Sequence, residues 1–260
     1  PRAKTALAAA ALAAAGVKAD IEKAQKQANA VVFQRLQEDI EGWRRERRYD
    51  FEKEYEFQFK GLARGSATHV AVLDPDGRAE CLKELLEHRA DPFQEASYGN
   101  PRVVKLEAIH LASGVGNVEV IKVLHEYVQK IPGGEKQELL LDKKTTQWDP
   151  ASFPKRWQEH YSPIHEAVFH GREEAVRCLI DLRADVNTGN VHQSTPMHLC
   201  ATGDRLTAPI HTTWQIAALL KKTGADLTLR DKKNYTPLLE AIKTCIDPRK
   251  LHLFVSPCFR

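Results

Sequence analysis

The chain has 260 residues, 42% of them hydrophobic and 28% charged, which is the composition of an ordinary soluble protein with one or two domains. Its five cysteines are odd in number and include no CxxC pair, which argues against a disulfide framework or a zinc finger and predicts a reducing, intracellular compartment. The formal net charge of +3 resides in residues 1–65, where thirteen Lys and Arg face ten Asp and Glu, and does not by itself indicate a nucleic-acid partner.

Residues 1–16 form an alanine-rich, basic segment. Its apolar run, Ala6 to Ala15, is about half the ~20 residues that a bilayer requires, so we predict no transmembrane helix. Two interpretations stay open: the remnant of an organelle-targeting sequence, or a helix that packs on a neighbour. We expect Pro1 to be a processed or truncated terminus, and we favour an organelle interior, in a plastid or mitochondrion, over the cytoplasm.

An N-terminal arm, residues 1–64, precedes the main domain, and residues 19–59 of it are predicted to be helical because they hold no proline and one glycine. Phe33, Leu36, Ile40 and Trp43 follow one another at spacings of three, four and three, a coiled-coil-like seam shorter than two heptads. We expect the seam to lie against the start of the main domain or against another subunit. Phe33, Leu36 and Trp43 are therefore candidate partner contacts.

A basic run, Arg44 to Arg48, lies near the end of this predicted helix and could indicate binding to nucleic acid or to an anionic membrane. Acidic residues on both sides neutralise it: Glu41, Glu46, Asp50, Glu52, Glu54 and Glu56. We therefore predict a solvated, ion-paired helix face and no nucleic-acid partner. The aromatic residues between Tyr49 and Phe59 partly alternate with charged ones, which leaves a short strand as the alternative here.

The main domain, residues 65–260, contains an internal repeat. The segments SPIHEAVFHG, from Ser162, and TPMHLCATG, from Thr195, place their first histidines thirty-three residues apart. Related segments begin at Tyr235 (YTPLLEAIK), Glu107 (EAIHLASGVG) and Ala67 (ATHVAVLDPDG). In this period and in its Thr-Pro-Leu-His-x-Ala signature, the chain resembles the ankyrin repeat family.

The resemblance implies an all-α ankyrin-repeat solenoid of about five helix-turn-helix repeats, with the arm as a helical N-terminal extension. The repeats lie near residues 65–100, 104–130, 161–190, 194–231 and 235–260. The Ser or Thr that opens a first helix is expected to accept a hydrogen bond from a free backbone N–H group. Arg89 and Arg183 stand where glycine usually ends the second helix, so each must adopt a positive φ or the turn must relax, at a cost of about 1 kcal/mol.

A long insertion, residues 129–160, separates the second and third repeats, because His110 and His165 lie fifty-five residues apart instead of thirty-three. Loops of this length are usually functional or disordered. Trp148, Phe153 and Trp157 supply aromatic anchors, so we expect the loop to dock, and we favour docking on its own repeats over docking on a partner. Trp148 and Trp157 are also candidate partner contacts.

Catalytic and metal-binding patterns are weak in this sequence. His160, His165 and His170 recur every five residues, which places them on different faces of a helix, and His198 with Cys200 lacks the further ligands that zinc needs. The sequence has no phosphate-binding glycine loop, no G-x-S-x-G and no HExxH. We predict a protein that is not an enzyme, with no catalytic residue, no cofactor, no metal and no small-molecule substrate.

The resemblance implies that the repeat histidines are structural and hydrogen-bond the backbone of the adjacent repeat: His69, His110, His165 and His198. It also implies that partners bind the hairpin tips and the exposed end of each first helix. The candidate contacts there are Tyr161, Phe169, His170, Val191, His192, Gln193, Thr202, Lys232, Lys233, Tyr235 and Lys243.

The function that the resemblance implies is protein binding. We expect a non-catalytic interaction scaffold that serves as an accessory or structural subunit of a larger protein assembly. The alternative is a regulatory adaptor or inhibitor that transiently binds an acidic client through its lysines. A third interpretation, a fragment of an enzyme whose catalytic domain lies outside these residues, is weaker because the chain holds no catalytic pattern.

Overall fold

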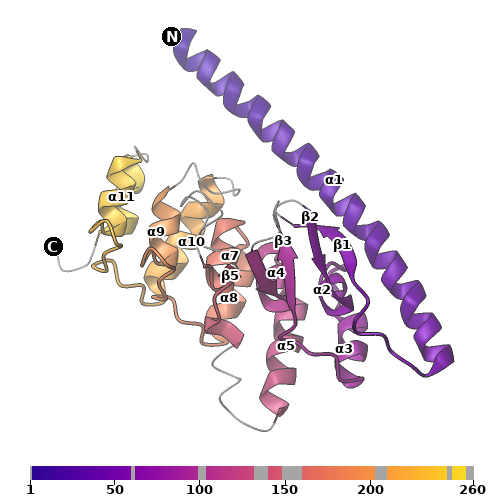
Figure 1. Ribbon diagram of the computed structural model, residues 1–260. Coiled ribbons are helices and arrows are strands. Elements are labelled where there is room, and N and C mark those ends of the chain that lie inside the picture. The colour runs from indigo at the N-terminus through magenta and orange to yellow at the C-terminus, as the bar shows by residue number, and fades with distance from the viewer. Residues whose placement is uncertain are drawn as a thin grey trace.

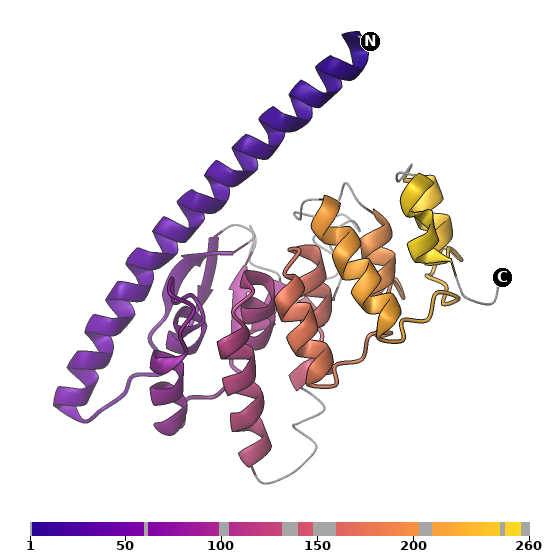
Figure 2. The ribbon, with the colours of Figure 1, turned by 180° about the vertical axis from the view of Figure 1, so that it is seen from behind.

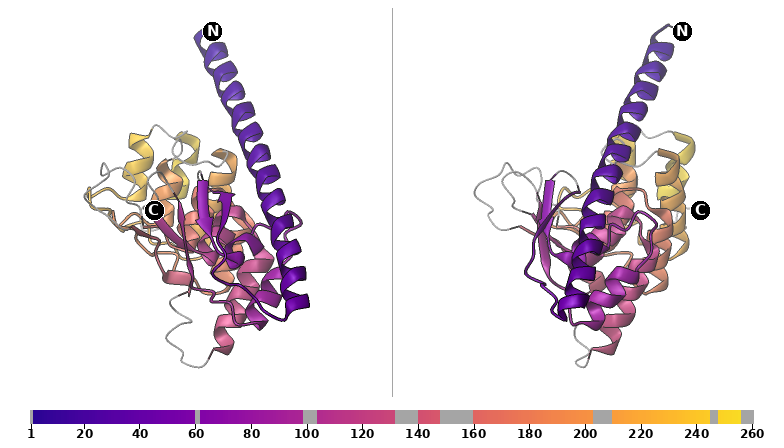
Figure 3. Two further views of the ribbon diagram at one scale, coloured as in Figure 1. Left: turned by 45° about the vertical axis from the view of Figure 1, so that its right-hand side comes forward. Right: turned by 90° about the vertical axis from the view of Figure 1, so that its right-hand side faces the viewer.

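The computed structural model describes residues 2–59, 62–98, 104–131, 140–147, 160–202, 210–244 and 248–255. Helix α1 (Arg2–Glu46) opens the chain, and its N-terminal part extends beyond the rest of the molecule (Figure 1, Figure 3). The other helices are shorter and stand in two rows (Figure 2). No helix within these residues combines the length and the apolar character that a membrane span requires.

The short helices form pairs that follow one another along the chain. The pairs are α2 (Ala67–Ala71) with α3 (Glu80–Glu87), α4 (Ala108–Val115) with α5 (Val118–Lys130), α7 (Pro163–Phe169) with α8 (Glu173–Asp181), α9 (Pro196–Thr202) with α10 (Ile210–Lys222), and α11 (Pro237–Lys243) with the 3-10 helix η2 (Pro248–Phe254). The first members of successive pairs pack on one another, and so do the second members. One hydrophobic core joins the pairs, so each is stabilised mainly by its neighbours.

Helix α8 shows how the sequence selects the buried side of a pair. Val176 and Leu179 lie three residues apart and are buried, while Arg177 on the opposite side is exposed and pairs with Glu173. Apolar residues at this spacing form one face of a helix, which must be covered by another element. The same arrangement in neighbouring helices builds the continuous core.

The connections that precede the first helices pair with one another as an antiparallel sheet, which corrects the prediction of an all-α fold. The strands lie in chain order: β1 (Tyr55–Gln58), β2 (Leu62–Gly65), β3 (Glu95–Tyr98), β4 (Val104–Glu107) and β5 (Thr146–Gln147). Tyr55 lies opposite Gly65, and Glu95 lies opposite Glu107. Adjacent extended segments satisfy each other's backbone N–H and C=O groups, which favours a sheet here. The molecule is nevertheless mostly helical.

Strand β1 also resolves the alternative left open for the aromatic stretch at the end of the arm. Tyr55 and Phe57 are buried and Glu56 is exposed, so the alternation of aromatic and charged residues is that of a strand with one buried face. The predicted helix is confirmed only as far as Glu46, where α1 ends. Arg47 has a positive φ of 53°, which turns the chain away from the helix axis.

The C-terminal half of α1 packs on β1 and α2. The seam side chains Phe33, Leu36, Ile40 and Trp43 are all buried in this contact. Polar contacts fix its register: the side-chain amide of Asn29 donates to the Gln58 carbonyl at 2.9 Å and accepts from the Gln58 N–H at 2.7 Å. Arg44 is ion-paired with Glu84 of α3. The arm is therefore held against the first helix pair of its own chain.

The turns after the second helices confirm one of the two geometries expected there. Arg89 and Arg183 both have a φ of 71°, in the left-handed region that favours glycine. Gly224 occupies the equivalent position after α10, with a φ of 98°. The turn keeps its shape in all three places, so the two arginines carry the backbone strain.

The described end of the long insertion packs on its own chain. Leu140 and Leu141 are buried, and β5 pairs with β4. Lys143 forms an ion pair with Glu107, the buried residue that precedes α4. Residues 140–147 therefore pack on the stack, whereas the predicted aromatic anchors Trp148, Phe153 and Trp157 lie outside the described residues.

Candidate partner-binding surface

Two histidines near the starts of first helices, His165 and His198, connect successive helix pairs. Nε2 of His165 lies 3.0 Å from the Ser194 carbonyl, and Nε2 of His198 lies 3.0 Å from the Tyr235 carbonyl. In each case the acceptor lies two residues before the next first helix. Nε2 of His110 instead contacts the carbonyl of Lys143, at 2.8 Å, because the inserted segment lies between it and α7.

These contacts determine which ring nitrogen carries the proton and which group the neighbouring hydroxyl hydrogen-bonds. Because Nε2 faces a carbonyl, it must carry the proton, and Nδ1 is then an acceptor. The hydroxyl of Ser162 donates to Nδ1 of His165 at 2.7 Å, and that of Thr195 lies 2.9 Å from Nδ1 of His198. The histidine therefore takes the place of the backbone N–H group that we expected these hydroxyls to bind.

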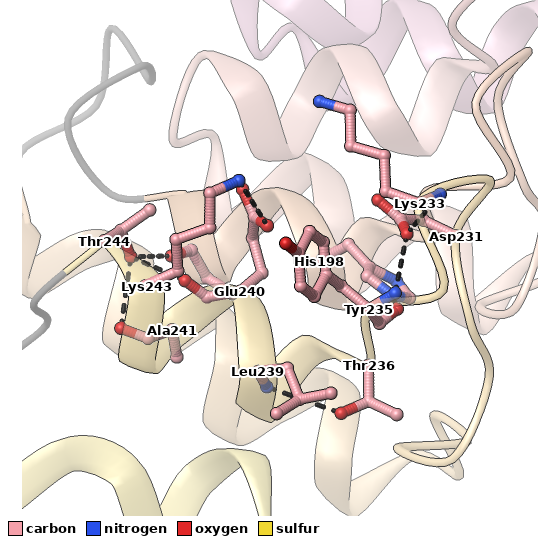
Figure 4. Close-up of polar contacts among 11 residues, drawn as sticks. His198, Asp231, Lys233, Tyr235, Thr236, Leu239, Glu240, Ala241, Lys243 and Thr244 are labelled. Carbon is pink, nitrogen blue, oxygen red and sulfur yellow. Dashed lines mark hydrogen bonds and ion pairs between the residues drawn. The ribbon is translucent and has the colours of Figure 1, made fainter.

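Helix α11 shows the expected cap because it has no histidine. Leu239 stands where the other first helices carry His, and the Thr236 hydroxyl accepts from the Leu239 backbone N–H at 3.4 Å (Figure 4). In α11 the hydroxyl therefore caps the helix N-terminus, as the sequence predicted.

The environment of these histidines and of Cys200 opposes acid–base or nucleophilic chemistry. Burial lowers the pKa of His165 to about 4 against the smaller, opposite effect of the Ser194 carbonyl. Burial lowers the pKa of His69 to about 4 as well, against the carbonyls of Leu106 and Gln94. Burial raises the pKa of the Cys200 thiol far above its usual range, so the thiolate is disfavoured. In the described part of the chain, these groups lie inside the stack.

The turn before α9 is a hairpin tip held by one asparagine. Oδ1 of Asn190 accepts from the backbone N–H groups of His192, at 2.8 Å, and Ser194, at 3.0 Å. Asn190 also pairs its backbone N–H with the Ser194 carbonyl. Gln193 has a φ of 57° and its side chain is exposed at the end of the tip. Val191 and His192 are half-buried.

The turn before α11 repeats this geometry with an aspartate. Oδ1 of Asp231 accepts from the backbone N–H groups of Lys233 and Tyr235, both at 2.9 Å. Asn234 has a φ of 66° and occupies the place of Gln193. The side chains of Lys232 and Lys233 are exposed. The two tips are therefore the same rigid turn with different side chains.

A backbone hydrogen bond joins the two tips into one surface. The Lys232 N–H donates to the His192 carbonyl at 2.8 Å. Burial, followed by the charges of Lys232 and Lys233, lowers the pKa of His192 below its usual value. The ring is thereby kept neutral at physiological pH. The positive charge of this surface, which we call the tip surface and define by Val191–Gln193 and Lys232–Tyr235, therefore comes from the two lysines.

Lys243, the last residue of α11, extends the tip surface because its side chain reaches back over Tyr235. Its Nζ lies 4.8 Å from the centre of the Tyr235 ring and 3.6 Å from Oε2 of Glu240 (Figure 4). The Lys243 side chain is exposed, while Tyr235 is half-buried. A cation over an aromatic face is a modest attraction, which orients Lys243 without burying its charge.

Two further candidates, Phe169 and His170, lie at the end of α7 and are half-buried. Their ring centres are 5.2 Å apart in an edge-on arrangement, and His170 also contacts Phe59 at 5.5 Å. Thr202 is half-buried, and its hydroxyl donates to the Leu199 carbonyl at 2.7 Å. These side chains offer a partner only part of their surface.

Four other residues that the sequence predicted as partner contacts are buried. Tyr161 is buried because its ring stacks on that of His165, at 5.6 Å, and its backbone pairs with Thr145 of the inserted segment. Phe33, Leu36 and Trp43 are buried because they form the contact of α1 with β1 and α2. A partner cannot reach these side chains unless the contacts inside the chain open.

Trp148 and Trp157 lie outside the described residues. The residues that organise the tips, Asn190 and Asp231, were missed in the sequence, although each precedes its Thr-Pro pair by a fixed number of residues. A side-chain oxygen at this place is the signal of a turn that binds its own backbone.

Comparison with protein families gave one match, to the model described as ankyrin repeats (3 copies), over residues 68–188. This segment contains the first three helix pairs and ends shortly before the turn that precedes α9. A comparison with curated proteins gave no match. Over residues 68–188, the match confirms the resemblance that the repeated signature predicted.

Proposed function

We propose that this chain, whose residues 68–188 belong to the ankyrin repeat family, is an accessory or structural subunit of a larger protein assembly. Ankyrin repeats are protein–protein interaction domains, which is the general function of this segment. In the narrower proposal, the chain has no catalytic activity of its own. It presents a preformed surface on which other subunits assemble.

We also propose that the ankyrin stack continues through α11 and η2, to about five repeats, with α1 as its N-terminal extension. The pairs after residue 188 support this extension, because Thr195-Pro196 and Thr236-Pro237 again open first helices. The bond from His198 to the Tyr235 carbonyl repeats the bond from His165 to the Ser194 carbonyl.

The observation that carries the proposal is the rigidity of the tip surface. Each tip is fixed by a side-chain oxygen that accepts two backbone hydrogen bonds, and the tips are joined to each other. A surface that is ordered before binding loses little conformational entropy when a partner arrives. Exposed Lys232, Lys233 and Lys243 on this surface favour a partner with acidic side chains.

One observation favours the alternative, a regulatory adaptor that binds an acidic client transiently. A permanent subunit that binds its partners through the seam would expose Phe33, Leu36 and Trp43 in the isolated chain, but these side chains are buried. The subunit proposal is supported instead by α1, whose N-terminal part extends beyond the repeats and whose Ile21 and Val31 are exposed.

Affinity purification of the chain from its native source, followed by size-exclusion chromatography, tests the proposal. A subunit elutes with a large complex of fixed composition at physiological salt. A chain that elutes alone, as a monomer of its own mass of 29.3 kDa, contradicts the subunit proposal. A complex that dissociates during the chromatography supports the transient adaptor instead.

A further inference from the structure

Helix α11 carries two exposed apolar side chains on one side. Leu239 and Ile242 are three residues apart and therefore lie on the same face of the helix. Their exposed fractions are 42% and 54%. We call this side of α11 the end face.

The equivalent positions in the preceding first helices are completely covered. The position of Leu239 is occupied by His69, His110, His165 and His198, which are all at most 2% exposed. The position of Ile242 is occupied by Val72, Ser113, Val168 and Ala201, which are all 0% exposed. Only α11 leaves these two positions open among the described first helices.

In the preceding pairs, the next first helix and the segment that leads into it cover these positions. Helix α9 packs on α11. Residues that flank α11 add hydrogen bonds: His198 bonds the Tyr235 carbonyl at 3.0 Å, and the Thr244 hydroxyl donates to the Ala201 carbonyl at 2.7 Å. The end face thus occupies the position at which the stack receives its next helix. It continues an interface that the molecule already forms several times.

The side chains of the end face are those of an interface. A terminal repeat that faces water carries a polar outer face. Leu239 and Ile242 are instead apolar, and Leu239 has replaced the histidine that would require a backbone carbonyl opposite it. The matching surface is therefore an apolar stripe that brings no hydrogen-bond acceptor.

Charge selects the kind of helix that fits. Lys243 lies one turn after Leu239, and Lys232 and Lys233 stand in the turn before α11, all of them exposed. A second copy of the chain, bound through its own α11, would bring like charges together. Acidic residues beside the apolar stripe would be attracted to these lysines.

We propose that the end face binds an amphipathic helix of a partner protein, with an apolar stripe flanked by acidic residues. This inference rests on the proposed interaction function and adds a second surface to it, at the end of the stack. The helix lies along α11 in the place that a following first helix would take. Leu239 and Ile242 contact its stripe, and the lysines contact its acidic flank.

Binding of a labelled synthetic peptide of about 20 residues tests the proposal, because shorter helices are unstable in water. The peptide carries Leu at helical i, i+3, i+4 and i+7 spacing with Glu on both flanks, and its fluorescence anisotropy is measured with the full chain. We expect saturable binding that Leu239→Glu with Ile242→Glu weakens at least tenfold. Leu62→Glu, at a leucine of β2 that is 45% exposed in the wild type, is the control and leaves binding unchanged.

A peptide with Lys in place of Glu is expected to bind at least tenfold more weakly. The proposal is overturned if the Glu-flanked peptide does not bind, or binds equally to the chain with Leu239→Glu and Ile242→Glu. It is also overturned if sedimentation shows a wild-type dimer that this variant dissociates, or if binding requires removal of residues 256–260. A negative peptide-binding result does not contradict the proposed function, because the size-exclusion test of that function does not depend on α11 binding a peptide.

Discussion

A histidine near the start of α7 and of α9 changes how these two first helices begin. Where it is present, as His165 or His198, the hydroxyl three residues earlier binds Nδ1, and Nε2 reaches the next pair. Where Leu239 replaces it, the Thr236 hydroxyl caps the helix backbone instead. The sequence predicted the helix start correctly, but a competing acceptor three residues away changed which group the hydroxyl binds.

Replacement of His165 by alanine is expected to lower the free energy of unfolding by about 2 to 4 kcal/mol at pH 7.5, because a buried ring and two buried hydrogen bonds are lost. Urea unfolding followed by circular dichroism measures the difference. Lost partner binding with unchanged stability would show that His165 is a binding residue and not a structural one.

The pH dependence of the same variant gives an independent check. The pKa of His165 falls from 6.5 to about 4 on folding, so its neutral form is the stable one in the stack. Its contribution is therefore complete above pH 6.5 and is lost as the pH falls towards 4. The stability difference between wild type and His165→Ala should shrink by about 2 kcal/mol between pH 7.5 and pH 5. A constant difference over this range would contradict a buried neutral ring.

Glycine at the end of α10 offers a test of the backbone strain that Arg89 and Arg183 bear. Gly224 has a φ of 98°, and a Cβ there would meet no atom within 4 Å, so Gly224→Ala should cost about 1 kcal/mol through strain alone. Gly42 lies inside α1 with equally open surroundings. Gly42→Ala is the control and should stabilise the chain by up to about 1 kcal/mol. Equal effects of the two substitutions on the melting temperature would refute this assignment.

At the scale of elements, the arm is part of the folded stack. Leu36 is fully buried between α1 and its neighbours, so Leu36→Ala should lower the free energy of unfolding by about 2 to 5 kcal/mol. Val31 lies on the opposite, exposed side of the same helix, and Val31→Ala should change it by less than about 0.5 kcal/mol. Equal, small effects of both substitutions on urea unfolding would mean that the arm is not docked.

The sequence predicted the helix pairs better than the strands. Apolar spacing and Ser/Thr-Pro starts mark the helices, because those signals are local. The strands are at most four residues long and depend on partners elsewhere in the chain, as when Ala63 lies opposite Tyr98. Such pairing leaves little trace in a single short segment.

The predicted partner contacts also depend on which parts of the chain come together, which a local pattern does not reveal. The spacing of the seam predicted that Phe33, Leu36 and Trp43 would be covered, but it could not tell whether β1 or another subunit covers them. Tyr161 was expected at an exposed tip, and the inserted Thr145 buries it. The lysines of the tip surface were placed correctly on the surface because charged side chains seldom leave water.

At the scale of the whole molecule, the helices stand in two rows, and the proposed partner binds on the side of only one of them. The tip surface lies before the first helices, whereas Lys122 and Lys130 are exposed on α5 in the other row. Charge reversal on either row should leave the fold unchanged, because exposed side chains contribute little to stability. Only reversal on the tips should weaken binding.

Whether partners bind the tip surface can be measured by quantitative affinity purification of three forms of the chain from its native source. Wild type should recover a set of subunits in fixed proportion, Lys232→Glu with Lys233→Glu should recover at least tenfold less of them, and Lys122→Glu with Lys130→Glu should match wild type. The three melting temperatures serve as the control for folding and should agree. If the Lys232→Glu, Lys233→Glu form recovered as many subunits as wild type, or if the wild-type chain purified alone, binding through the tip surface would be contradicted.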